Sequence, residues 1–433
     1  MHFFRQLVKK FIPTKLFRRV EPIGHLIEAI LANIIYGFPS RGMRVIGVTG
    51  TNGKTTTVFL IHKMLAKAGY KVGMLSTVAY GIGDNIKPQI EHMTTVDSFT
   101  LQKRLRSFKK AGVRWVIIET SSHALAQNRV WGIPYEIAVM TNVTKDHLDY
   151  HGNFKKYLEA KQKLFLLTNN NPRGFGIINA DDINANKFIE SISKSMTYGI
   201  NSGNLIAQNI KLEPDHIRFK VPVKQDLYDM RVNIPGDFNI SNGLAAVATG
   251  LQLGLTQKQI EEGIASLDSV EGRMNIINEG QKFKVMIDFA STPDAFERLF
   301  NTIRPAVKGK LIAVFGSAGR RDESKRAIQG EIAGKYADEV VLTEEDDRDV
   351  DGQEILNQIA EGSKKAGKTL DKNLFLVHKR EDAIKFALKR AKYRDDMVIF
   401  LGKGHEKTIE RADGVHSWNE TEVVRKALRK LMK

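Results

Sequence analysis

Residues 45–57 read V-I-G-V-T-G-T-N-G-K-T-T-T and bring glycine, lysine and hydroxyl side chains together in one short stretch. An apolar strand enters a glycine-rich turn, and Lys54 then begins a helix. The backbone N–H groups of such a turn, with the helix N-terminus, bind phosphates. We expect Lys54 to contact the β- and γ-phosphates of a nucleotide and Thr55 to hold Mg²⁺. The spacing differs from the common G-x-x-x-x-G-K-[ST] pattern, because position 48 is valine and the glycines are Gly47, Gly50 and Gly53.

Two further segments carry a carboxylate or a histidine just beyond an apolar run. Residues 117–129 read I-I-E-T-S-S-H-A-L-A-Q-N-R and contain Glu119, and residues 141–152 read T-N-V-T-K-D-H-L-D-Y-H-G and contain His147. A buried carboxylate is costly unless it meets a cation, so we expect Mg²⁺ beside Glu119. The alternative is a surface glutamate at a strand end. His147 is interpreted as a second Mg²⁺ ligand, against the alternative of a helix-capping or core histidine.

The elements that would position these residues alternate between short β-rich runs and amphipathic helical segments. Strands are predicted at residues 44–48, 115–119 and 137–141, and a second series that begins near Val285 has strands at 310–315, 339–343, 373–377 and 397–401. This alternation is typical of α/β folds with a mostly parallel sheet, whose sites lie at the carboxyl ends of the strands. Residues 201–234 are predicted to be an extended, inserted antiparallel piece. We expect domain limits at 1–44, 45–269 and 270–433.

The composition excludes some kinds of chemistry. The 433 residues include 66 Lys+Arg, 49 Asp+Glu and no cysteine, and the formal net charge is +17. Without cysteine there are no disulfides, thiol nucleophiles or thiolate metal sites, and oxygen and histidine ligands favour a hard metal ion. The positive surplus suits nucleic acid, an anionic membrane, a phosphorylated substrate or a lysine-rich surface. Because no secretory signal is evident, we expect a cytoplasmic protein.

The N-terminal residues combine basic and bulky apolar side chains. Residues 1–44 hold eight Lys/Arg and two Glu. The apolar run at 23–36 is interrupted by polar residues and is too short to cross a bilayer, which takes about 20 residues, so an amphipathic helix is predicted. Such a helix could contact anionic lipid headgroups. The alternative is a helix that packs on the following domain and leaves its lysines in solvent.

Eight motifs, in this order, resemble those of the Mur ligases, the ATP-dependent amide-forming enzymes of peptidoglycan synthesis. They are T-G-T-N-G-K-T-T, E-T-S-S-H-A-L, T-N-V-T-K-D-H-L-D-Y-H-G, Y-L-E-A-K-Q-K-L-F, I-N-A-D-D, G-D-F-N-I-S-N-G-L-A-A, E-G-R-M and G-K-G-H-E. The chain is most similar to the UDP-N-acetylmuramoyl-tripeptide synthetase type, which adds the third residue of the peptide. The resemblance implies a central P-loop ATPase domain, a C-terminal Rossmann-like α/β domain and a short helical N-terminal extension.

The resemblance also implies roles in binding ATP and Mg²⁺. Asn242 would contact adenine, Asp288 the ribose, and Arg273 the phosphates across the domain interface. Thr55 and Glu119 would hold one Mg²⁺ and His147 a second Mg²⁺, and Lys161 falls where the family carries a carbamylated lysine that is a further metal ligand. An ordinary helix lysine is the alternative for Lys161. The phosphate loop would consist of Gly50, Thr51, Asn52, Gly53, Lys54, Thr55 and Thr56.

Other positions match the sites for the two substrates to be joined. The muramoyl peptide would contact Thr94, Thr95, Ser121, Gln127 and Arg129. The incoming amino acid would contact Arg321, Glu345, Asp346, Asp347, Arg348, Gly402 and Glu406. Enzymes of this type that take meso-diaminopimelate usually have D-N-P-R where this chain has E-D-D-R. The retained arginine suits a second carboxylate, as in meso-diaminopimelate, and the acids suit the ammonium of lysine or ornithine. Both kinds of amino acid therefore stay open. A third alternative is an exposed acidic loop that binds no ligand.

The chain departs from the family pattern at three places. The usual A-H-T-P becomes A-S-T-P at residues 290–293, and the usual V-P-G-R becomes V-E-G-R at residues 270–273. Typical members also carry an N-terminal domain that reads the UDP of the substrate, whereas 44 residues precede the first predicted strand here. The carrier on the acceptor is therefore left open between UDP and a lipid, and residues 1–36 are a candidate for contact with the inner face of the membrane.

Together these features predict an ATP-dependent ligase that adds an amino acid, expected to be a diamino acid, to a muramoyl-peptide precursor through an acyl phosphate. We expect a monomer that uses ATP and Mg²⁺ and does not bind nucleic acid. A ligase similar to folylpolyglutamate synthase is one alternative, although those enzymes usually show G-K-G-S at the phosphate loop. A basic nucleic-acid-binding protein on a retired ligase fold is the other, and the net charge alone supports it.

Overall fold

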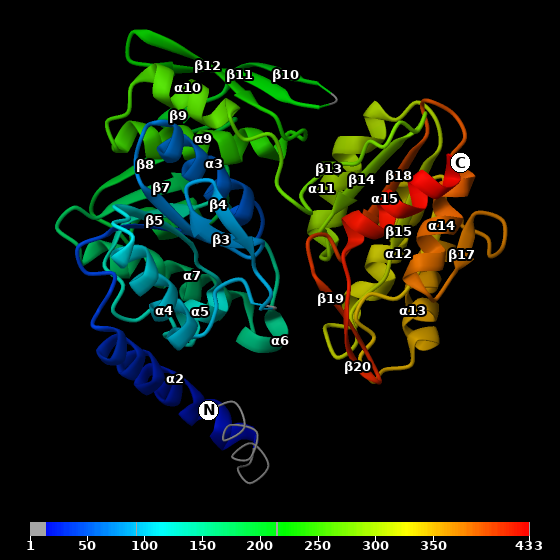
Figure 1. The fold of residues 1–433 in the computed structure, drawn as a ribbon, viewed down its shortest axis with the longest axis horizontal. Coiled ribbons are helices and arrows are strands. Elements are labelled where there is room, and N and C mark those ends of the chain that lie inside the picture. Colours follow the sequence, from blue (N-terminus) through cyan, green and yellow to red (C-terminus); the bar gives the residue numbers. More distant parts are fainter. Residues whose placement is uncertain (1–13, 92, 214, 433) are drawn as a thin grey trace. The chain divides into compact units, whose positions relative to one another are not determined.

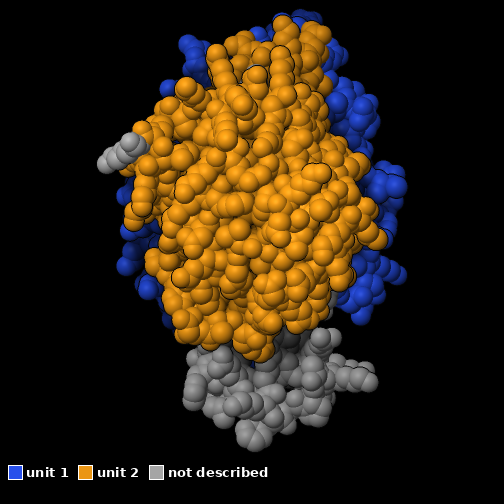
Figure 2. All heavy atoms as spheres, turned by 90° about the vertical axis from the view of Figure 1, so that its right-hand side faces the viewer, with its two compact units in different colours: residues 1–208, 220–230, 241–266 blue, residues 209–219, 231–240, 267–433 orange. Residues whose placement is uncertain are grey.

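The computed structural model describes residues 14–91, 93–213 and 215–432, without the side chains of residues 14–22 and 149. The chain forms two compact units, which are coloured separately in Figure 2. Unit 1 comprises residues 1–208, 220–230 and 241–266, and unit 2 comprises residues 209–219, 231–240 and 267–433. Each unit contains a mostly parallel sheet covered by helices (Figure 1), as the alternating pattern of the sequence predicts.

The sheet of unit 1 has nine strands in the order β4-β3-β2-β5-β1-β6-β7-β8-β9. Its central strands, β1, β5 and β6, are buried almost throughout, because helices cover both faces of a parallel sheet. The pairs β2–β3 and β3–β4 are antiparallel and the remaining pairs are parallel. The strands are β1 (Arg44–Thr49), β2 (Val72–Leu75), β3 (Ala79–Ile82), β4 (Asn85–Pro88), β5 (Trp115–Glu119), β6 (Tyr135–Met140), β7 (Phe175–Asn179), β8 (Ser195–Gly199) and β9 (Leu205–Ile206).

Nine described helices, α2 to α10, lie before unit 2's sheet, and some of them begin at side chains that cap the helix N-terminus. Asp97 caps α4 by accepting from the Thr100 N–H, and Thr256 forms a capping box with Gln259 at α10. Apolar residues of α4, α5, α7 and α8 form one core with the sheet. The helices are α2 (Thr14–Tyr36), α3 (Lys54–Lys67), α4 (Ser98–Lys110), α5 (Ser122–Ala126), α6 (Leu148–His151), α7 (Phe154–Asn169), α8 (Ala185–Ile189), α9 (Phe238–Gln252) and α10 (Gln257–Ala265).

A separate three-stranded sheet, β10-β11-β12, follows β9. Its strands are β10 (Gln208–Leu212), β11 (Ile217–Val223) and β12 (Asp226–Val232). Along β11 and β12, buried and exposed residues alternate, which is the pattern of a sheet with one face covered. This piece confirms the prediction of an extended insertion within residues 201–234.

The sheet of unit 2 has six strands in the order β13-β14-β18-β15-β16-β17, of which β13 alone runs antiparallel to its neighbour. The strands are β13 (Asn275–Ile276), β14 (Lys284–Asp288), β15 (Leu311–Phe315), β16 (Glu339–Leu342), β17 (Leu374–Leu376) and β18 (Met397–Leu401), and a hairpin adds β19 (Thr408–Arg411) and β20 (Gly414–Ser417). The helical elements are α11 (Pro293–Ile303), the 3₁₀ turn η1 (Arg304–Ala306), α12 (Ser324–Tyr336), α13 (Gly352–Lys365), α14 (Arg380–Arg390) and α15 (Glu420–Leu431).

The strand predictions are confirmed with shifts at some ends. The strands at 115–119 and 397–401 are found without change, whereas the strand predicted at 137–141 starts and ends earlier, at Tyr135–Met140. The helix predicted at 23–36 begins at Thr14. In the described part of the chain, no helix combines the length and the apolar character needed to cross a membrane.

Candidate active site

The phosphate loop joins the carboxyl end of β1 to the first turn of α3, at the centre of the nine-stranded sheet. Gly50 has φ of 150°, and a Cβ there would lie 1.9 Å from Thr141 Oγ1. Gly53 has φ of 82°, and a Cβ there would lie 2.3 Å from Asn242 Oδ1. Both positions therefore require glycine, because a side chain would be strained and would collide with a neighbour. The loop can bring its backbone close to a phosphate for the same reason.

Thr55 and Glu119 come together at the carboxyl ends of two neighbouring strands. β1 pairs with β5 in parallel, so the start of α3 lies beside the end of β5. Thr55 Oγ1 lies 3.1 Å from each carboxylate oxygen of Glu119, and the Thr77 N–H donates to Glu119 Oε2 at 2.8 Å. Glu119 is buried, and the Thr55 hydroxyl and the Thr77 N–H are neutral donors. The structure thus brings together two of the residues predicted to hold Mg²⁺.

Two lysines converge on the carbonyl groups of the phosphate loop. Lys54 Nζ donates to the Thr51 carbonyl at 2.7 Å, and Lys161 Nζ, from α7, donates to the Gly50 carbonyl at 2.6 Å. Burial holds the pKa of Lys161 well below its usual range, and the charge of Lys54 lowers it further, while Asp146 opposes the shift. A larger fraction of Lys161 is therefore neutral at a given pH than of an ordinary exposed lysine.

The loop after β6 secures the phosphate loop from the other side. Asn52 N–H donates to Asn142 Oδ1 at 2.9 Å, and Asn142 Nδ2 donates to the Asn52 carbonyl at 3.0 Å. The Thr51 hydroxyl lies 2.9 Å from the Tyr157 hydroxyl, and it also accepts from the Thr144 N–H at 3.0 Å. These contacts fix the loop in the conformation that its glycines allow.

His147 lies in a group of aromatic rings beside the phosphate loop. Its ring centroid is 4.6 Å from that of His123 and 6.2 Å from that of Tyr157, and its backbone has a left-handed φ of 52°. Asp146 Oδ2 is 3.4 Å from His147 Nε2. Burial lowers the pKa of His123 to about 2, so this neighbouring ring is neutral. His147 is half exposed.

The residues predicted to bind the muramoyl peptide lie near Glu119, at the carboxyl end of β5. Thr95 Oγ1 donates to the Glu119 carbonyl at 2.8 Å and lies 3.3 Å from Ser121 Oγ. The Arg129 guanidinium, which is buried, donates to the Thr95 carbonyl. Thr94 lines the same small recess as Thr95 and Glu119, and Gln127 directly follows α5. Four of these five positions therefore lie together around the end of β5.

Two other residues predicted to bind the nucleotide lie on helices of unit 1. Asn242, on α9, accepts from the Thr57 hydroxyl at 3.3 Å and stands against Gly53. Thr56 is buried in the first turn of α3. The structure thus places Asn242 beside the phosphate loop.

In unit 2, Asp288 and Arg273 lie side by side. Both carboxylate oxygens of Asp288, at the end of β14, accept backbone N–H groups at 2.7 Å, one from Met274 and one from Ala290. Burial raises the pKa of Asp288, while the charge of Arg273 opposes the rise. The Arg273 guanidinium lies 5.0 Å from the ring centroid of Phe289. Asp288 therefore fixes the turn that carries Arg273.

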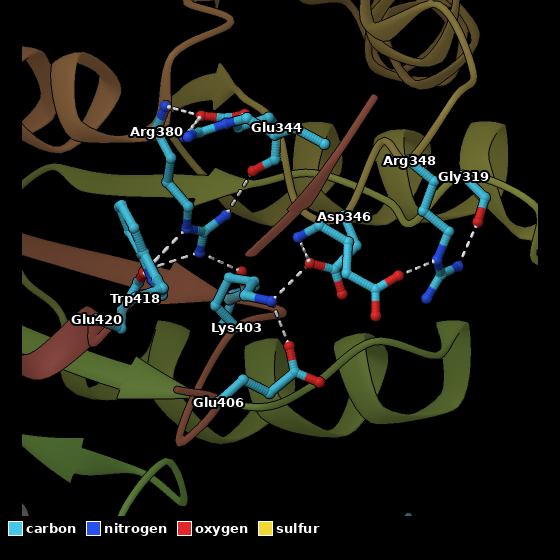
Figure 3. Close-up of polar contacts among 12 residues, drawn as sticks. Gly319, Glu344, Asp346, Arg348, Arg380, Lys403, Glu406, Trp418 and Glu420 are labelled. Atoms are coloured by element: carbon cyan, nitrogen blue, oxygen red, sulfur yellow. Dashed lines mark hydrogen bonds and ion pairs between the residues drawn. The ribbon is translucent and has the colours of Figure 1, made fainter. Parts of the chain in front are cut away.

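The acidic segment after β16 surrounds a buried lysine. Lys403 Nζ donates to Asp346 Oδ1 at 2.8 Å and to the carboxylate of Glu406, and Figure 3 shows it between the two. Burial disfavours the charge of Lys403, but the carboxylates of Glu406 and Asp346 outweigh it and raise its pKa. Glu345 is buried against Gly402, where a Cβ would lie 2.4 Å from Glu345 Oε2, and burial raises the pKa of Glu345.

Arg348 lies in the same acidic segment and is held by neighbours that are distant in the chain. These neighbours come from two other segments of the chain: Nε donates to Glu410 Oε2 of β19 at 2.6 Å, and Nη1 donates to the carbonyl of Gly319, after β15, at 2.5 Å. Asp347 Oδ2 lies 2.7 Å from His378 Nε2. Arg321 is exposed in the loop before α12 and, within the described residues, takes no part in the network around Lys403.

Comparison with known proteins identifies the family. Residues 48–250 match the Mur ligase middle domain, and residues 272–404 match the Mur ligase glutamate ligase domain. The chain is 38% identical over 424 residues to UDP-N-acetylmuramyl-tripeptide synthetase of Roseiflexus sp., a match that spans 95% of this chain and 83% of the relative. The chain belongs to the Mur ligase family. Members of this family are ATP-dependent ligases of peptidoglycan synthesis, and this chain is such an enzyme.

Other relatives agree with this assignment. The Mur ligase described here is 36% identical over 428 residues to UDP-N-acetylmuramoyl-L-alanyl-D-glutamate–2,6-diaminopimelate ligase 1 of Clostridium acetobutylicum, covering 98% of this chain and 86% of the relative. A solved structure of a UDP-N-acetylmuramoyl-L-alanyl-D-glutamate–2,6-diaminopimelate ligase superposes with a TM-score of 0.62 at 30% identity, over 90% of this chain and 79% of that one. Folylpolyglutamate synthase of Mycobacterium tuberculosis, at 16% identity and a TM-score of 0.73 over 94% and 95% of the two chains, shares the fold.

Several residues of this Mur ligase site were not assigned a role from the sequence. Lys403 lies inside the quoted G-K-G-H-E motif, so a charged residue flanked by glycines was a signal for it. Tyr157 and Asn142 also lie inside quoted motifs. Arg380 had no local signal, because its partners are distant: it pairs with Glu420 and donates to the Glu344 and Leu401 carbonyls (Figure 3).

Proposed function

We propose that this Mur ligase joins a diamino acid to the carboxylate of a muramoyl-peptide precursor and forms ADP and phosphate. The observation that carries the proposal is the phosphate loop with Lys54, Thr55 and Glu119 at the ends of paired strands, in a chain 38% identical to a tripeptide synthetase. We assign ATP binding to residues 45–269 and amino-acid binding to residues 270–433. The residues predicted above for ATP, muramoyl peptide and amino acid are retained as the proposed site.

Mg²⁺ fits the oxygen ligands beside the phosphate loop. The buried carboxylate of Glu119 and the hydroxyl of Thr55 are hard donors 3.1 Å apart, and the donors that the structure gives to Glu119 are uncharged. A divalent ion there would offset both the buried charge and the charge of the transferring phosphoryl group. His147 would hold a second Mg²⁺, and a modified Lys161 would be a further metal ligand.

Carbamylation of Lys161 has chemical support in the structure. The reaction with carbon dioxide requires a neutral amine, and burial together with Lys54 keeps the pKa of Lys161 low. The product is an anionic carbamate, which converts a cation into a carboxylate-like metal ligand. Lys161 points at the Gly50 carbonyl from α7, so the added group would lie at the phosphate loop.

The proposed reaction proceeds in two steps. One oxygen of the acceptor carboxylate attacks the γ-phosphorus of ATP, which forms an acyl phosphate and releases ADP. The amine of the amino acid then attacks the acyl carbon, loses a proton, and expels phosphate that carries one oxygen of the original carboxylate. Lys54 and Arg273 would stabilise charge on the phosphoryl oxygens.

The acidic surroundings of Lys403 support an amino acid with a second ammonium group. Glu345, Asp346 and Glu406 lie within one cluster, whereas the charge of Arg348 is already offset by Glu410. Nε and Nη1 of Arg348 bind Glu410 and the Gly319 carbonyl, and we propose that Nη2 binds a carboxylate of the substrate. Lysine or ornithine and meso-diaminopimelate are therefore the amino acids to compare.

The acceptor is proposed to be a muramoyl dipeptide on UDP or on a lipid. The names of the relatives in Roseiflexus and Clostridium specify UDP-linked muramoyl peptides. We propose that the enzyme acts as a monomer in the cytoplasm or at the inner face of the membrane.

The test is a panel of lysine, ornithine, meso-diaminopimelate and alanine, each offered with Mg·ATP and a UDP-linked or lipid-linked muramoyl dipeptide. ADP release and product mass are measured for every pair. We expect a product for at least one diamino acid and none for alanine. A product with alanine alone, or ADP release without a new amide, would overturn the proposal.

A further inference from the structure

The N-terminal helix α2 carries a row of exposed aliphatic side chains. Their spacing of i, i+4, i+8, i+11 and i+12 places them on one helical face. We call this row the aliphatic stripe; its members and their exposed fractions are Ile23 58%, Ile27 53%, Leu31 43%, Ile34 58% and Ile35 59%. Isolated exposed apolar residues are ordinary, but a continuous row is typical of a binding surface.

The opposite face of α2 already has its partners in unit 1. Ala29, Ala32 and Asn33 are buried there, and Asn33 Nδ2 donates to the Trp131 carbonyl at 2.9 Å. α2 also lies beside α4 (Figure 1), and Arg106 reaches the Ile35 carbonyl at 3.5 Å. Small and polar side chains of α2 thus face the protein, while the five large aliphatic side chains of the stripe are exposed.

Positive charge lies beside the stripe on the neighbouring helix α4, which contacts α2. α4 exposes Lys103, Arg106, Lys109 and Lys110. Glu28 of α2 is partly buried and lies 3.8 Å from His25. An occupant of the stripe must therefore be apolar at its centre and anionic on the side of α4.

We propose that the aliphatic stripe of α2 lies in the headgroup region of an anionic lipid bilayer, with the exposed Lys and Arg of α4 on the lipid phosphates. An amphipathic helix with aliphatic and basic faces binds in the plane of such a surface. α2 lacks the apolar length to cross the bilayer. The stripe contains no Trp, Tyr or Arg, the residues that dominate protein–protein hot spots, so lipid is favoured over a protein partner. This inference does not depend on the proposed ligase reaction.

The test is co-sedimentation of the full chain with vesicles of phosphatidylcholine alone or with about 30% phosphatidylglycerol. The native chain should bind the anionic vesicles at least about tenfold more strongly than the neutral ones, and salt should weaken the binding. The variant Ile23→Gln/Ile27→Gln/Ile34→Gln should lose about tenfold or more of this affinity. The matched control Leu166→Gln/Ile183→Gln replaces exposed apolar residues elsewhere in unit 1 and should bind like the native chain.

Three results would overturn the proposal. The first is equal binding of the native chain to neutral and anionic vesicles, or no binding to either. The second is an unchanged affinity in the stripe variant, with circular dichroism showing that it is folded. The third is a native dimer, seen by analytical ultracentrifugation, that the stripe substitutions dissociate while vesicle binding is absent; this would assign the stripe to a second copy of the chain. Lys103→Glu/Lys110→Glu should weaken binding to anionic vesicles alone, which separates the charge contribution from the apolar one.

Discussion

Lys161 is a buried amine next to another lysine, and this setting links its protonation to stability. Burial and Lys54 lower its pKa in the folded protein, whereas an unfolded lysine titrates near 10.4. Between these two values the unfolded chain binds a proton that the folded chain does not. The folding penalty is therefore greatest at low pH and is relieved as pH rises towards the unfolded pKa.

Replacing this lysine should make stability less dependent on pH. When the pH is lowered from 9.5 to 6.5, the free energy of unfolding of Lys161→Met should rise by about 1–2 kcal/mol relative to that of the native enzyme. The reason is that only the native chain has a buried lysine that disfavours folding at the lower pH. Urea unfolding at the two pH values measures the difference. Lys163→Met, at an exposed position of the same helix, is the control and should show the native pH dependence. An identical pH dependence in native enzyme and Lys161→Met would contradict the low pKa.

The phosphate and metal assignments predict large losses of activity. Lys54→Ala and Glu119→Gln should each lower amino-acid-dependent ADP release by about 10²–10³-fold, since each removes a charge directed at the transferring phosphoryl group or its metal ion. Steady-state ADP release with saturating substrates measures the effect. Lys67→Ala, at the exposed end of the same helix as Lys54, should keep native activity. Near-native rates for either site variant would refute its role.

The roles of single residues could be predicted from the sequence where their neighbours are close in the chain. Lys54 and Thr55 follow their glycines directly, so their roles could be inferred from spacing. The contact of Lys161 with the Gly50 carbonyl joins residues 111 positions apart, and the motif alone could not place it. The pairing of Arg348 with Glu410 likewise depends on a hairpin whose position is fixed only by folding.

Among the elements, the β1–α3 connection depends on Gly50. Gly50→Ala should destabilise the protein by about 1–3 kcal/mol and weaken nucleotide binding about tenfold or more, because the new Cβ would collide with Thr141 Oγ1. Urea unfolding and calorimetric titration with ADP measure the two effects. Gly24→Ala, where a Cβ meets no atom within 4 Å, should have neither. Native ADP affinity in Gly50→Ala would show that the loop tolerates a side chain.

The elements of unit 2 are joined by a buried ion pair between α14 and α15. Arg380 and Glu420 are both fully buried, and Arg380 also donates to the Leu401 carbonyl at 2.8 Å, at the end of β18. Arg380→Met should therefore lower the free energy of unfolding by about 3–5 kcal/mol, since it leaves the Glu420 carboxylate buried without its partner. Arg380→Met/Glu420→Gln should recover part of this loss in urea unfolding. A loss in the single variant below about 1 kcal/mol would contradict a structural role for the pair.

Strand positions could be predicted because the central strands are continuous apolar runs, as in β5 and β18. The ends of strands were less predictable. β6 starts at Tyr135, two residues before the predicted start, because the charged residue Glu136 belongs to the strand and is buried in an ion pair with Arg44 of the adjacent strand. The start of α2 at Thr14 was missed, because residues 14–22 mix charges with apolar residues and contain Pro22.

For the whole molecule, the proposal requires both units, because Lys54 belongs to unit 1 and Arg273 to unit 2. Binding of a non-hydrolysable ATP analogue with Mg²⁺ should therefore make the enzyme more compact, as substrates close many two-domain enzymes. Small-angle X-ray scattering should show a smaller radius of gyration with the analogue than without it. The Lys54→Ala variant should not respond, and a radius that is unchanged in the native enzyme would contradict closure.

The net charge of +17 was the most ambiguous feature of the sequence, since it suits several anionic partners. In the described residues, part of this charge lies at Lys54 of the phosphate loop and on the exposed Lys and Arg side chains of α4. Such placement arises from folding and cannot be read from composition.

The central claim is that the enzyme activates a muramoyl-peptide carboxylate as an acyl phosphate before the amide forms. The most direct measurement uses an acceptor whose carboxylate is labelled with ¹⁸O, with Mg·ATP and the diamino acid, followed by mass spectrometry of the phosphate released. The account predicts one ¹⁸O atom in each phosphate, formed together with one amide. Unlabelled phosphate accompanying amide formation would contradict it.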